Sequence, residues 1–411
     1  MGDITDAIST GSDYASLSDE EIIARLCTYT PVNPDSEKNV WAYWDKGLVN
    51  APAWNQRNVV SWVRRLGPSW TVRVLDIVGG SPTHVSKYVD DSYLPKAFLD
   101  KDLPGPHAAA SASDLVRLPL LYQYGGVWID VGLLLFRSLD ALCWDALTEP
   151  GTSYELAGFA VNMGPEVGMI FNGFIAARKG CICAKYWHDI LLEAWRHTNS
   201  ISGMSSHPLL RHLPRYEPPS RNGKMPPFRY AQFADYLSQV FALERLRHLT
   251  DPETGWNGPE YFDAKVLLFD CVSEVYWAER LTNWDGKKQF ELLGQQREGA
   301  VEEDGGYKEA DAFVSGILSK SSTMKISHGL PTAGRVYLAE LWDKPENADA
   351  DRKPGSFAAY LRWASEHFEQ TLPLQPVKMP LVPGSSLTGG ILTGRGKPRE
   401  EEGQENCADG T

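Results

Sequence analysis

The segment from residue 39 to residue 78 constrains the fold most, because it has the order strand, helix, strand. Residues 39–43 are suited to a short strand, and residues 55–66 place apolar side chains at the spacing of one helix face. Gly67-Pro68 ends this helix, and residues 71–78 alternate and are rich in β-branched side chains, which is typical of a strand. Such a unit joins parallel strands, so the sequence predicts an α/β fold with a largely parallel sheet.

The rest of the chain is consistent with one large domain between two tails. Residues 1–18 are polar and acidic, and residues 371–411 are rich in Pro, Gly, Ser and Glu without periodicity, so both ends are predicted to be disordered. Residues 19–370 of the 411-residue chain are expected to form a single domain. Within it, residues 200–320 alternate loops and helices, and we interpret them as insertions on the sheet.

Charge and composition limit the partners and the compartment. The formal net charge of −13 argues against binding to nucleic acid or to an anionic membrane surface, since both need a basic face. No window holds eighteen consecutive apolar residues, and the N-terminus lacks the basic start and apolar run of a signal peptide. The six cysteines have no framework spacing and indicate buried thiols. We therefore expect a cytoplasmic protein with no integral membrane segment.

Residues 108–130 carry the side chains that indicate chemistry. The first part has a helical pattern that Pro119 is expected to kink or divide, and Gly125-Gly126 ends it. Asp114 and Arg117 are three residues apart and therefore share a face of this helix. A carboxylate and a guanidinium on one face can bind the hydroxyls of a sugar and the oxygens of its phosphate. The alternative is an ordinary intrahelical salt bridge on a solvated face.

Asp130 favours a ligand site over a solvated salt bridge. It ends the apolar strand of residues 127–129, where a carboxylate has no packing reason to lie. In open α/β sheets, ligands bind beyond the carboxyl ends of the strands. A carboxylate at that place can hold a divalent ion across a diphosphate, and the ion would neutralise a leaving nucleoside diphosphate. The alternative for Asp130 is a structural acid in a turn.

The run SDLVRLPLLYQYGGVWIDVGLLLFRSLD resembles the DXD-region signature of the capsular polysaccharide synthesis family. That family is related to α-mannosyltransferases with a DXD sugar-binding region and to glucosylating bacterial toxins. The resemblance extends to NVWAYWDKG near the start, to NGFIAA at residues 172–177 and to MKISHG at residues 324–329. It implies a GT-A fold, in which a mainly parallel, mixed sheet is flanked by helices. The donor-binding part then covers about residues 36–180, and residues 200–320 form the acceptor side.

The resemblance also implies roles for individual residues. It assigns Trp44 to the base of the donor, Ser113 and Asp114 to ribose and sugar, Arg117 to sugar and phosphates, Trp128 to the nucleotide, Asp130 to the first acid of the DXD element, and Asn172 to the transferred sugar. From the residue pattern alone, Trp44 is equally suited to the core at a strand end, and an asparagine before glycine is also a common turn residue.

A metal site follows from the same resemblance, with one departure. His328 resembles the late metal or diphosphate ligand of GT-A enzymes, so Asp130 and His328 are expected to hold Mn²⁺ or Mg²⁺, although a lone histidine also suits a structural role. The family element continues as Asp-x-Asp or Asp-Ala-Ser/Thr, whereas this chain has Asp130-Val131-Gly132. Gly132 has no ligand side chain, which puts metal dependence in question.

The function implied by the resemblance is transfer of a hexose from a UDP- or GDP-linked donor, with retention of anomeric configuration. The acceptor is a small molecule, a glycan or a protein. The alternative is a catalytically weak or inactive nucleotide-sugar-binding relative, which Gly132 motivates. An unrelated α/β enzyme such as a hydrolase ranks last, because the chain has no Gly-x-Ser-x-Gly elbow, no Walker loop and no His-Glu-x-x-His motif.

Overall fold

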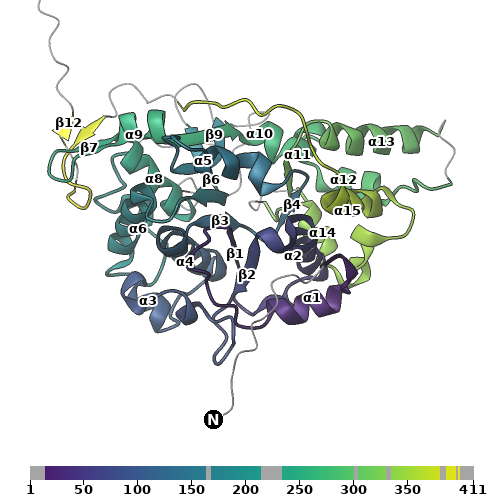
Figure 1. Cartoon of the computed structure of the whole chain (residues 1–411), viewed down its shortest axis with the longest axis horizontal. Coiled ribbons are helices and arrows are strands. Elements are labelled where there is room, and N and C mark those ends of the chain that lie inside the picture. Colours follow the sequence, from purple (N-terminus) through teal and green to yellow (C-terminus); the bar gives the residue numbers. More distant parts are fainter. Residues whose placement is uncertain are drawn as a thin grey trace, which may run out of the picture.

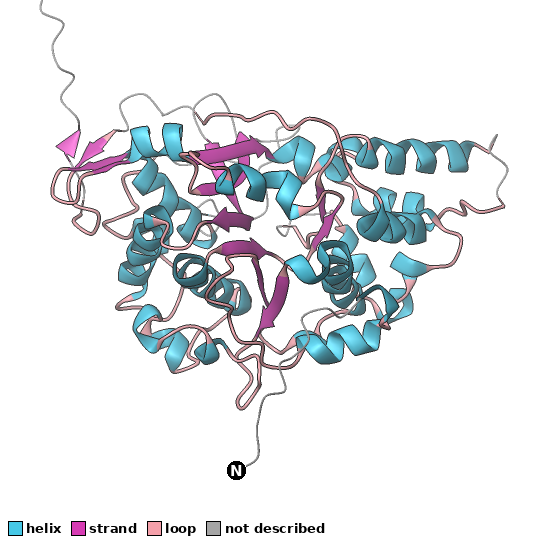
Figure 2. Cartoon of the chain, viewed as in Figure 1, coloured by secondary structure: helices cyan, strands magenta, loops and turns pink. Residues whose placement is uncertain are grey.

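Six strands form the central sheet of the computed structural model, in the order β2-β1-β3-β6-β5-β9 (Figure 2). Their bounds are β1 Asn39–Tyr43, β2 Thr71–Leu75, β3 Gly126–Ile129, β5 Leu156–Asn162, β6 Gly168–Ala177 and β9 Val266–Asp270. β1 pairs in parallel with β2 and β3, and β5 pairs in parallel with β9, while β6 runs antiparallel to β3 and β5. The predicted α/β fold with a mixed, mainly parallel sheet is thus confirmed.

The structure describes residues 14–162, 168–213, 234–299, 304–329, 335–379, 386–394 and 397–398. Its helices are α1 Asp19–Leu26, α2 Ala53–Leu66, α3 Lys96–Leu99, α4 Ala108–Tyr124, α5 Asp145–Thr148, α6 Ile182–Trp195, α8 Ser238–His248, α9 Gly258–Lys265, α10 Cys271–Glu274, α11 Trp277–Leu281, α12 Gly286–Gly294, α13 Gly305–Leu318, α14 Leu338–Trp342 and α15 Phe357–His367. In these ranges, no helix is both long and apolar enough to cross a membrane.

The alternation of strand side chains divides the core into two layers. Trp41 and Trp128 face the layer that contains α4, α6 and α8, whereas Val40 and Val127 face the layer that contains α1 and α2. Figure 1 shows α4 and α6 on one side of β1 and α2 on the other. Every residue of β1 is buried, as expected for a parallel strand covered on both faces.

Two smaller sheets complete the fold. β4 (Leu133–Leu135) pairs antiparallel with β10 (Thr323–Lys325), and this pair packs against α12, α13, α14 and α15 in a third apolar cluster. β7 (Leu249–Asp251), β8 (Trp256–Asn257), β11 (Leu387–Thr388) and β12 (Lys397–Pro398) form a four-stranded sheet. β4 begins three residues after Asp130, so its pairing with β10 brings residues near 325 to the end of β3.

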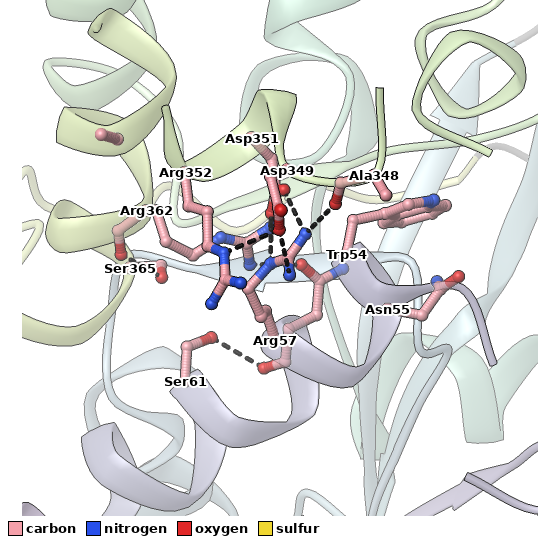
Figure 3. A network of polar contacts seen from close by, with 12 residues as sticks. Trp54, Asn55, Arg57, Ser61, Ala348, Asp349, Asp351, Arg352, Arg362 and Ser365 are labelled. Carbon is pink, nitrogen blue, oxygen red and sulfur yellow. Dashed lines mark hydrogen bonds and ion pairs between the residues drawn. The ribbon is translucent and has the colours of Figure 1, made fainter. Parts of the chain in front are cut away.

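A buried polar network holds the C-terminal helix α15 on α2. Arg57 of α2 donates from Nε to Asp351 Oδ2 over 2.9 Å, and Arg362 of α15 donates to the same carboxylate over 2.5 Å. Arg362 also donates to Asn58 Oδ1 over 2.6 Å, so the contacts run continuously between the two helices. Figure 3 shows the Asp351 carboxylate between the two guanidinium groups. This network fixes the third cluster against the central domain.

The structure corrects several predicted element boundaries. Pro119 was expected to kink or divide the predicted helix, and the second of these outcomes is wrong, because α4 runs unbroken from Ala108 to Tyr124 with Pro119 inside it. Pro119 removes one helical hydrogen bond, but Leu118 and Leu120 beside it are fully buried and hold both halves in place. The strand predicted to reach residue 78 ends at Leu75. The next residue is Asp76, whose carboxylate accepts hydrogen bonds from the loop that follows the strand.

Parts of both predicted tails are placed on the domain. Tyr14 and Leu17 pack against the α1–α2 layer, although residues 1–18 were predicted to be disordered; residues 1–13 lie outside the described ranges. Near the other end, the Val377 N–H donates to Leu268 O of β9 over 2.8 Å, and Arg245 donates to Ile391 O over 3.0 Å. Backbone pairing with a sheet edge explains this placement, which hydrophobic periodicity does not reveal. The segment at residues 200–320 is likewise more than an insertion, because it supplies β9.

Candidate functional site

Asp130 lies directly after β3, beyond the carboxyl end of the central parallel strands. Its N–H donates to Gly173 O of β6 over 2.9 Å, which fixes the backbone. Trp128 Nε1 donates to Asp130 Oδ1 over 3.0 Å, and Lys325 Nζ donates to Oδ2 over 2.8 Å. The position predicted from sequence, at the ligand-binding edge of the sheet, is therefore the one that the carboxylate occupies.

Arg117 connects α4 to this edge. Its NH2 lies 2.8 Å from Asp114 Oδ1 and 4.0 Å from Asp130 Oδ1, so the structure brings together the three side chains on which the sequence interpretation depends. NH2 also donates to Ser113 Oγ over 2.9 Å, and NH1 donates to the Asn172 carbonyl over 2.7 Å. The guanidinium lies over the Trp128 ring, 4.9 Å from its centroid. Arg117 thus ties α4, β3 and β6 together.

A second set of hydrogen bonds fixes Asp114. Asn172 Nδ2 lies 3.3 Å from Asp114 Oδ1 and 2.9 Å from Gln239 Oε1. Gln239 at the start of α8 donates in turn to the Asp114 carbonyl over 2.7 Å. The structure therefore brings Asn172 of β6 into contact with Asp114, in a closed ring of hydrogen bonds rather than in a turn.

The side chains differ in how much surface they retain. The exposed fraction is 4% for Arg117, 17% for Asp114, 29% for Asp130 and 14% for Lys325. Arg117 is nearly covered, and almost all its N–H groups already donate hydrogen bonds within the protein. This changes its expected role from direct contact with the nucleotide sugar to positioning of the carboxylates. Asp114, Asp130 and Lys325 form the accessible rim of the site, which we call the acid–lysine rim.

Burial and neighbouring charges separate the two carboxylates. Burial raises the pKa of Asp114 to about 6, against the attraction of Arg117 and with a further rise from the charge of Asp130. Burial also disfavours ionisation of Asp130, but the charges of Lys325 and Arg117 outweigh it and hold the pKa of that carboxyl below its usual value. Asp130 is therefore ionised throughout the neutral range, whereas Asp114 gains a proton in mild acid.

Two glycines are required by close approach at the rim. A Cβ on Gly173 would lie 2.6 Å from Asp130 Oδ2 and 2.4 Å from the Phe171 ring. A Cβ on Gly132 would lie 2.6 Å from the Ile326 carbonyl and 3.5 Å from Lys325 Nζ. A side chain at Gly132, as in the Asp-x-Asp pattern, would thus clash with the Ile326 carbonyl just after β10 and would lie in van der Waals contact with the lysine.

The two tryptophans of the sequence prediction have different positions. Trp128 is 1% exposed beneath Arg117, so the structure makes it a hydrogen-bond donor to Asp130 rather than an aromatic surface beside the nucleotide. Trp44 follows β1, the strand next to β3, and is half-buried. Its Nε1 has no hydrogen-bond partner among the described residues. Buried N–H groups usually have a hydrogen-bond partner, and a bound nucleotide base would supply one here, in line with the expected base-binding role.

His328 takes part in a different set of contacts. Its Nε2 lies 2.6 Å from Asp343 Oδ2, and Asp343 Oδ1 accepts from Trp54 Nε1 over 2.8 Å. No contact in the described part of the chain joins His328 to Asp130. The structure therefore places the two predicted metal ligands in separate networks.

The side chains around Asp130 do not fit as ligands of the divalent metal that the resemblance implies. Across the described ranges, no group of three His, Cys, Asp or Glu side chains is arranged to hold an ion. Both Asp130 oxygens already accept hydrogen bonds, and the Lys325 ammonium lies at one of them. A divalent ion at the same oxygen would be repelled by that ammonium, at a cost on the order of several kcal/mol in a partly buried site.

Sequence reasoning missed three residues at or beside the site. Lys325 lies 195 positions after Asp130 in the chain, and Gln239 is 125 positions after Asp114. Glu279 is buried near Lys325, and burial raises its pKa to about 8 against the attraction of that lysine. The only available signal was the run MKISHG at residues 324–329, which belongs to the resemblance and contains Lys325 alone of these three residues.

These features define the class: an α/β enzyme with an acid–arginine–acid cluster at the carboxyl edge of its sheet. The family described as "Capsular polysaccharide synthesis protein" matches residues 20–204. Glycosyltransferase afumC of Aspergillus fumigatus is 61% identical over 385 residues, covering 94% of this chain and 98% of that protein. The chain therefore belongs to this family and is a glycosyltransferase.

More distant relatives carry related names. O-glycosyltransferase braB of Annulohypoxylon truncatum is 46% identical, covering 91% of this chain and 90% of that protein. O-glycosyltransferase PaGT of Phomopsis amygdali is 39% identical, covering 90% of this chain and 91% of that protein. Among solved structures, PaToxG Glycosyltransferase matches 43% of this chain and 67% of its own with 14% identity and a TM-score of 0.29, a likeness too low to bear on the site.

Proposed function

We propose that the protein transfers a hexose from a UDP- or GDP-linked donor to a hydroxyl oxygen of an acceptor, with retention of anomeric configuration. The observation that carries the proposal is the acid–lysine rim, where Asp114 from α4, Asp130 after β3 and Lys325 from β10 lie around one polar site with Arg117 beneath. A nucleotide sugar offers hydroxyls for the carboxylates and a diphosphate for a cation.

The acceptor atom is proposed from the relatives. Two of them are named O-glycosyltransferases and cover nine-tenths of this chain, which favours an acceptor oxygen here. The acceptor itself, a small molecule, a glycan or a protein, is not specified by the acid–lysine rim.

The proposed mechanism assigns positioning and charge stabilisation to the protein. Asp114 and Asp130 accept hydrogen bonds from sugar or ribose hydroxyls, while Arg117 keeps the Asp114 carboxylate in place. The acceptor oxygen forms a bond to the anomeric carbon on the face from which the diphosphate leaves, as the bond to the phosphate oxygen breaks. The acceptor proton passes to the departing phosphate oxygen, so no protein nucleophile or base is required. Electrostatic stabilisation of the leaving group is the main contribution of the site.

A panel of nucleotide sugars tests this function. The purified protein is mixed with UDP-glucose, UDP-galactose or GDP-mannose, and thermal stabilisation and released nucleoside diphosphate are measured with manganese and with chelator. We expect one donor to stabilise the protein and to be slowly hydrolysed. Stabilisation without hydrolysis or transfer would instead support the non-catalytic relative that Gly132 suggested, and no response to any of the three donors would contradict the proposal.

Donor affinity is expected to fall in mild acid because Asp114 becomes protonated. Burial raises the pKa of this carboxyl to about 6. The ionised carboxylate, which accepts hydrogen bonds from the nucleotide sugar, therefore dominates above that pH and is lost below it. At pH 5 about one-tenth of Asp114 remains ionised, so the donor dissociation constant should rise about tenfold between pH 7.5 and pH 5. Calorimetric titration across this range measures the change.

Asp114→Asn is the matched control for this pH dependence. The variant cannot ionise at this position, so it should bind the donor weakly and with a nearly flat pH profile. A variant that keeps the wild-type profile would assign the titration to another group and contradict the role of Asp114.

A further inference from the structure

Lys325 is held at the place where a second acidic ligand would lie in the Asp-x-Asp pattern. β10 pairs with β4 so that Lys325 lies opposite Leu133, the residue after Gly132. The Ile326 N–H donates to the Gly132 carbonyl over 2.7 Å, which fixes the two backbones together. A Cβ on Gly132 would be 3.5 Å from Lys325 Nζ, so the ammonium fills the space beside Asp130.

We propose that the Lys325 ammonium binds the donor diphosphate in the role that a divalent metal has in Asp-x-Asp enzymes, so that this enzyme transfers sugar without a metal. The inference rests on the proposed function, because it names the group that neutralises the leaving diphosphate. It extends that function by assigning a metal-independent reaction and a binding residue that the sequence prediction did not include.

The charge balance of the acid–lysine rim supports this assignment. Asp114 is paired with Arg117 and Asp130 with Lys325, so each carboxylate already has a cation. A metal site needs an excess of anionic oxygen ligands, which this arrangement lacks. A diphosphate needs the reverse, a cation with free donors at an accessible surface.

Lys325 meets that requirement better than Arg117. An ammonium has three donors, and the described contacts use one of them, on Asp130 Oδ2. The side chain retains 14% of its surface, against 4% for Arg117, whose donors go to Ser113, Asp114 and Asn172. Lys325 therefore has two hydrogens for phosphate oxygens, while Asp130 sets the direction of the ammonium.

The first test needs no variant. Hydrolysis of the stabilising nucleotide sugar by the wild-type protein is compared after exhaustive chelation with EDTA and after addition of millimolar Mn²⁺ or Mg²⁺. We expect turnover to agree within about twofold in all three conditions, and UDP or GDP to bind in the presence of EDTA. Turnover that is lost on chelation and restored by Mn²⁺ would overturn the metal-independent reaction while leaving the glycosyltransferase function intact.

Variants then test the lysine itself. Lys325→Met should lower kcat by at least about 100-fold, the usual effect of removing one group that stabilises a leaving anion, and should weaken UDP or GDP binding. Lys325→Arg, which keeps the charge, should recover part of both, whereas Lys287→Met at the exposed start of α12 should equal wild type. Thermal midpoints confirm that each variant is folded.

Wild-type kcat and nucleotide affinity in folded Lys325→Met would overturn the role of Lys325. A wild-type protein that neither binds nor hydrolyses any tested donor, with or without metal, would overturn the proposed function and this inference together. These two outcomes are distinguishable, because the wild-type protein is active in the first and inactive in the second.

Discussion

Asp130→Asn lowers turnover by at least about 100-fold and leaves the fold intact: with Lys325→Met, this is the largest effect on activity that we expect. The substitution keeps the shape of the side chain and removes the charge that pairs with Lys325 and faces Arg117. Oriented charge in a partly desolvated site is worth about 3 kcal/mol or more to the transition state when it stabilises a reacting group. Release of nucleoside diphosphate under saturating donor measures the loss.

Asp263→Asn is the control for this experiment. Asp263 in α9 pairs with Lys378 at an exposed site, with 78% of its side chain accessible, so its replacement should leave turnover unchanged. Circular dichroism and the thermal midpoint establish that both variants are folded. A folded Asp130→Asn protein with wild-type turnover would contradict the assignment of this carboxylate to the reaction.

Asp351→Ala is expected to have the largest effect on stability, about 3–5 kcal/mol. The carboxylate is 2% exposed and is bound by Arg57 and Arg362, so its removal leaves two nearly buried guanidinium groups without the one buried counter-ion that they share. Burial disfavours the charged carboxylate, but the two arginines hold its pKa below the usual value. The stabilisation is therefore present at neutral pH and is lost only as pH falls through that lowered pKa in acid. Denaturant unfolding monitored by tryptophan fluorescence measures the free energy.

Asp349→Ala is the matched control for Asp351→Ala. Asp349 lies 3.6 Å from the same Arg57 and also pairs with Arg352, but 68% of its side chain is exposed. An exposed ion pair contributes less than about 1 kcal/mol, so this variant should be close to wild type. Equal losses in the two variants would show that burial does not set the strength of the network.

Local patterns predicted most of the fold. The order of β1, α2 and β2 follows from hydrophobic periodicity, because each element is short-range and covered by one neighbouring layer. The failures occurred where the outcome depends on distant contacts: Pro119 stays in a continuous helix because of packing, and residues 376 and 377 are placed by pairing with β9.

The site was predictable only in its sequence-local half. Asp114, Arg117 and Asp130 lie within 17 positions of one another, and the helix, glycine turn and strand between them determine that they meet. Lys325 reaches Asp130 through the pairing of β10 with β4, which no local pattern specifies. The space beside Gly132 is likewise set by that pairing, so the sequence showed that a ligand side chain was missing but not what had replaced it.

A structure of the protein crystallised with its stabilising nucleotide sugar tests the central claim most directly, since it locates the donor. We predict that the diphosphate lies within hydrogen-bond distance of Lys325 Nζ and that sugar or ribose hydroxyls contact the Asp114 and Asp130 carboxylates. A donor bound elsewhere on the molecule, with the acid–lysine rim in contact with water alone, would contradict the account.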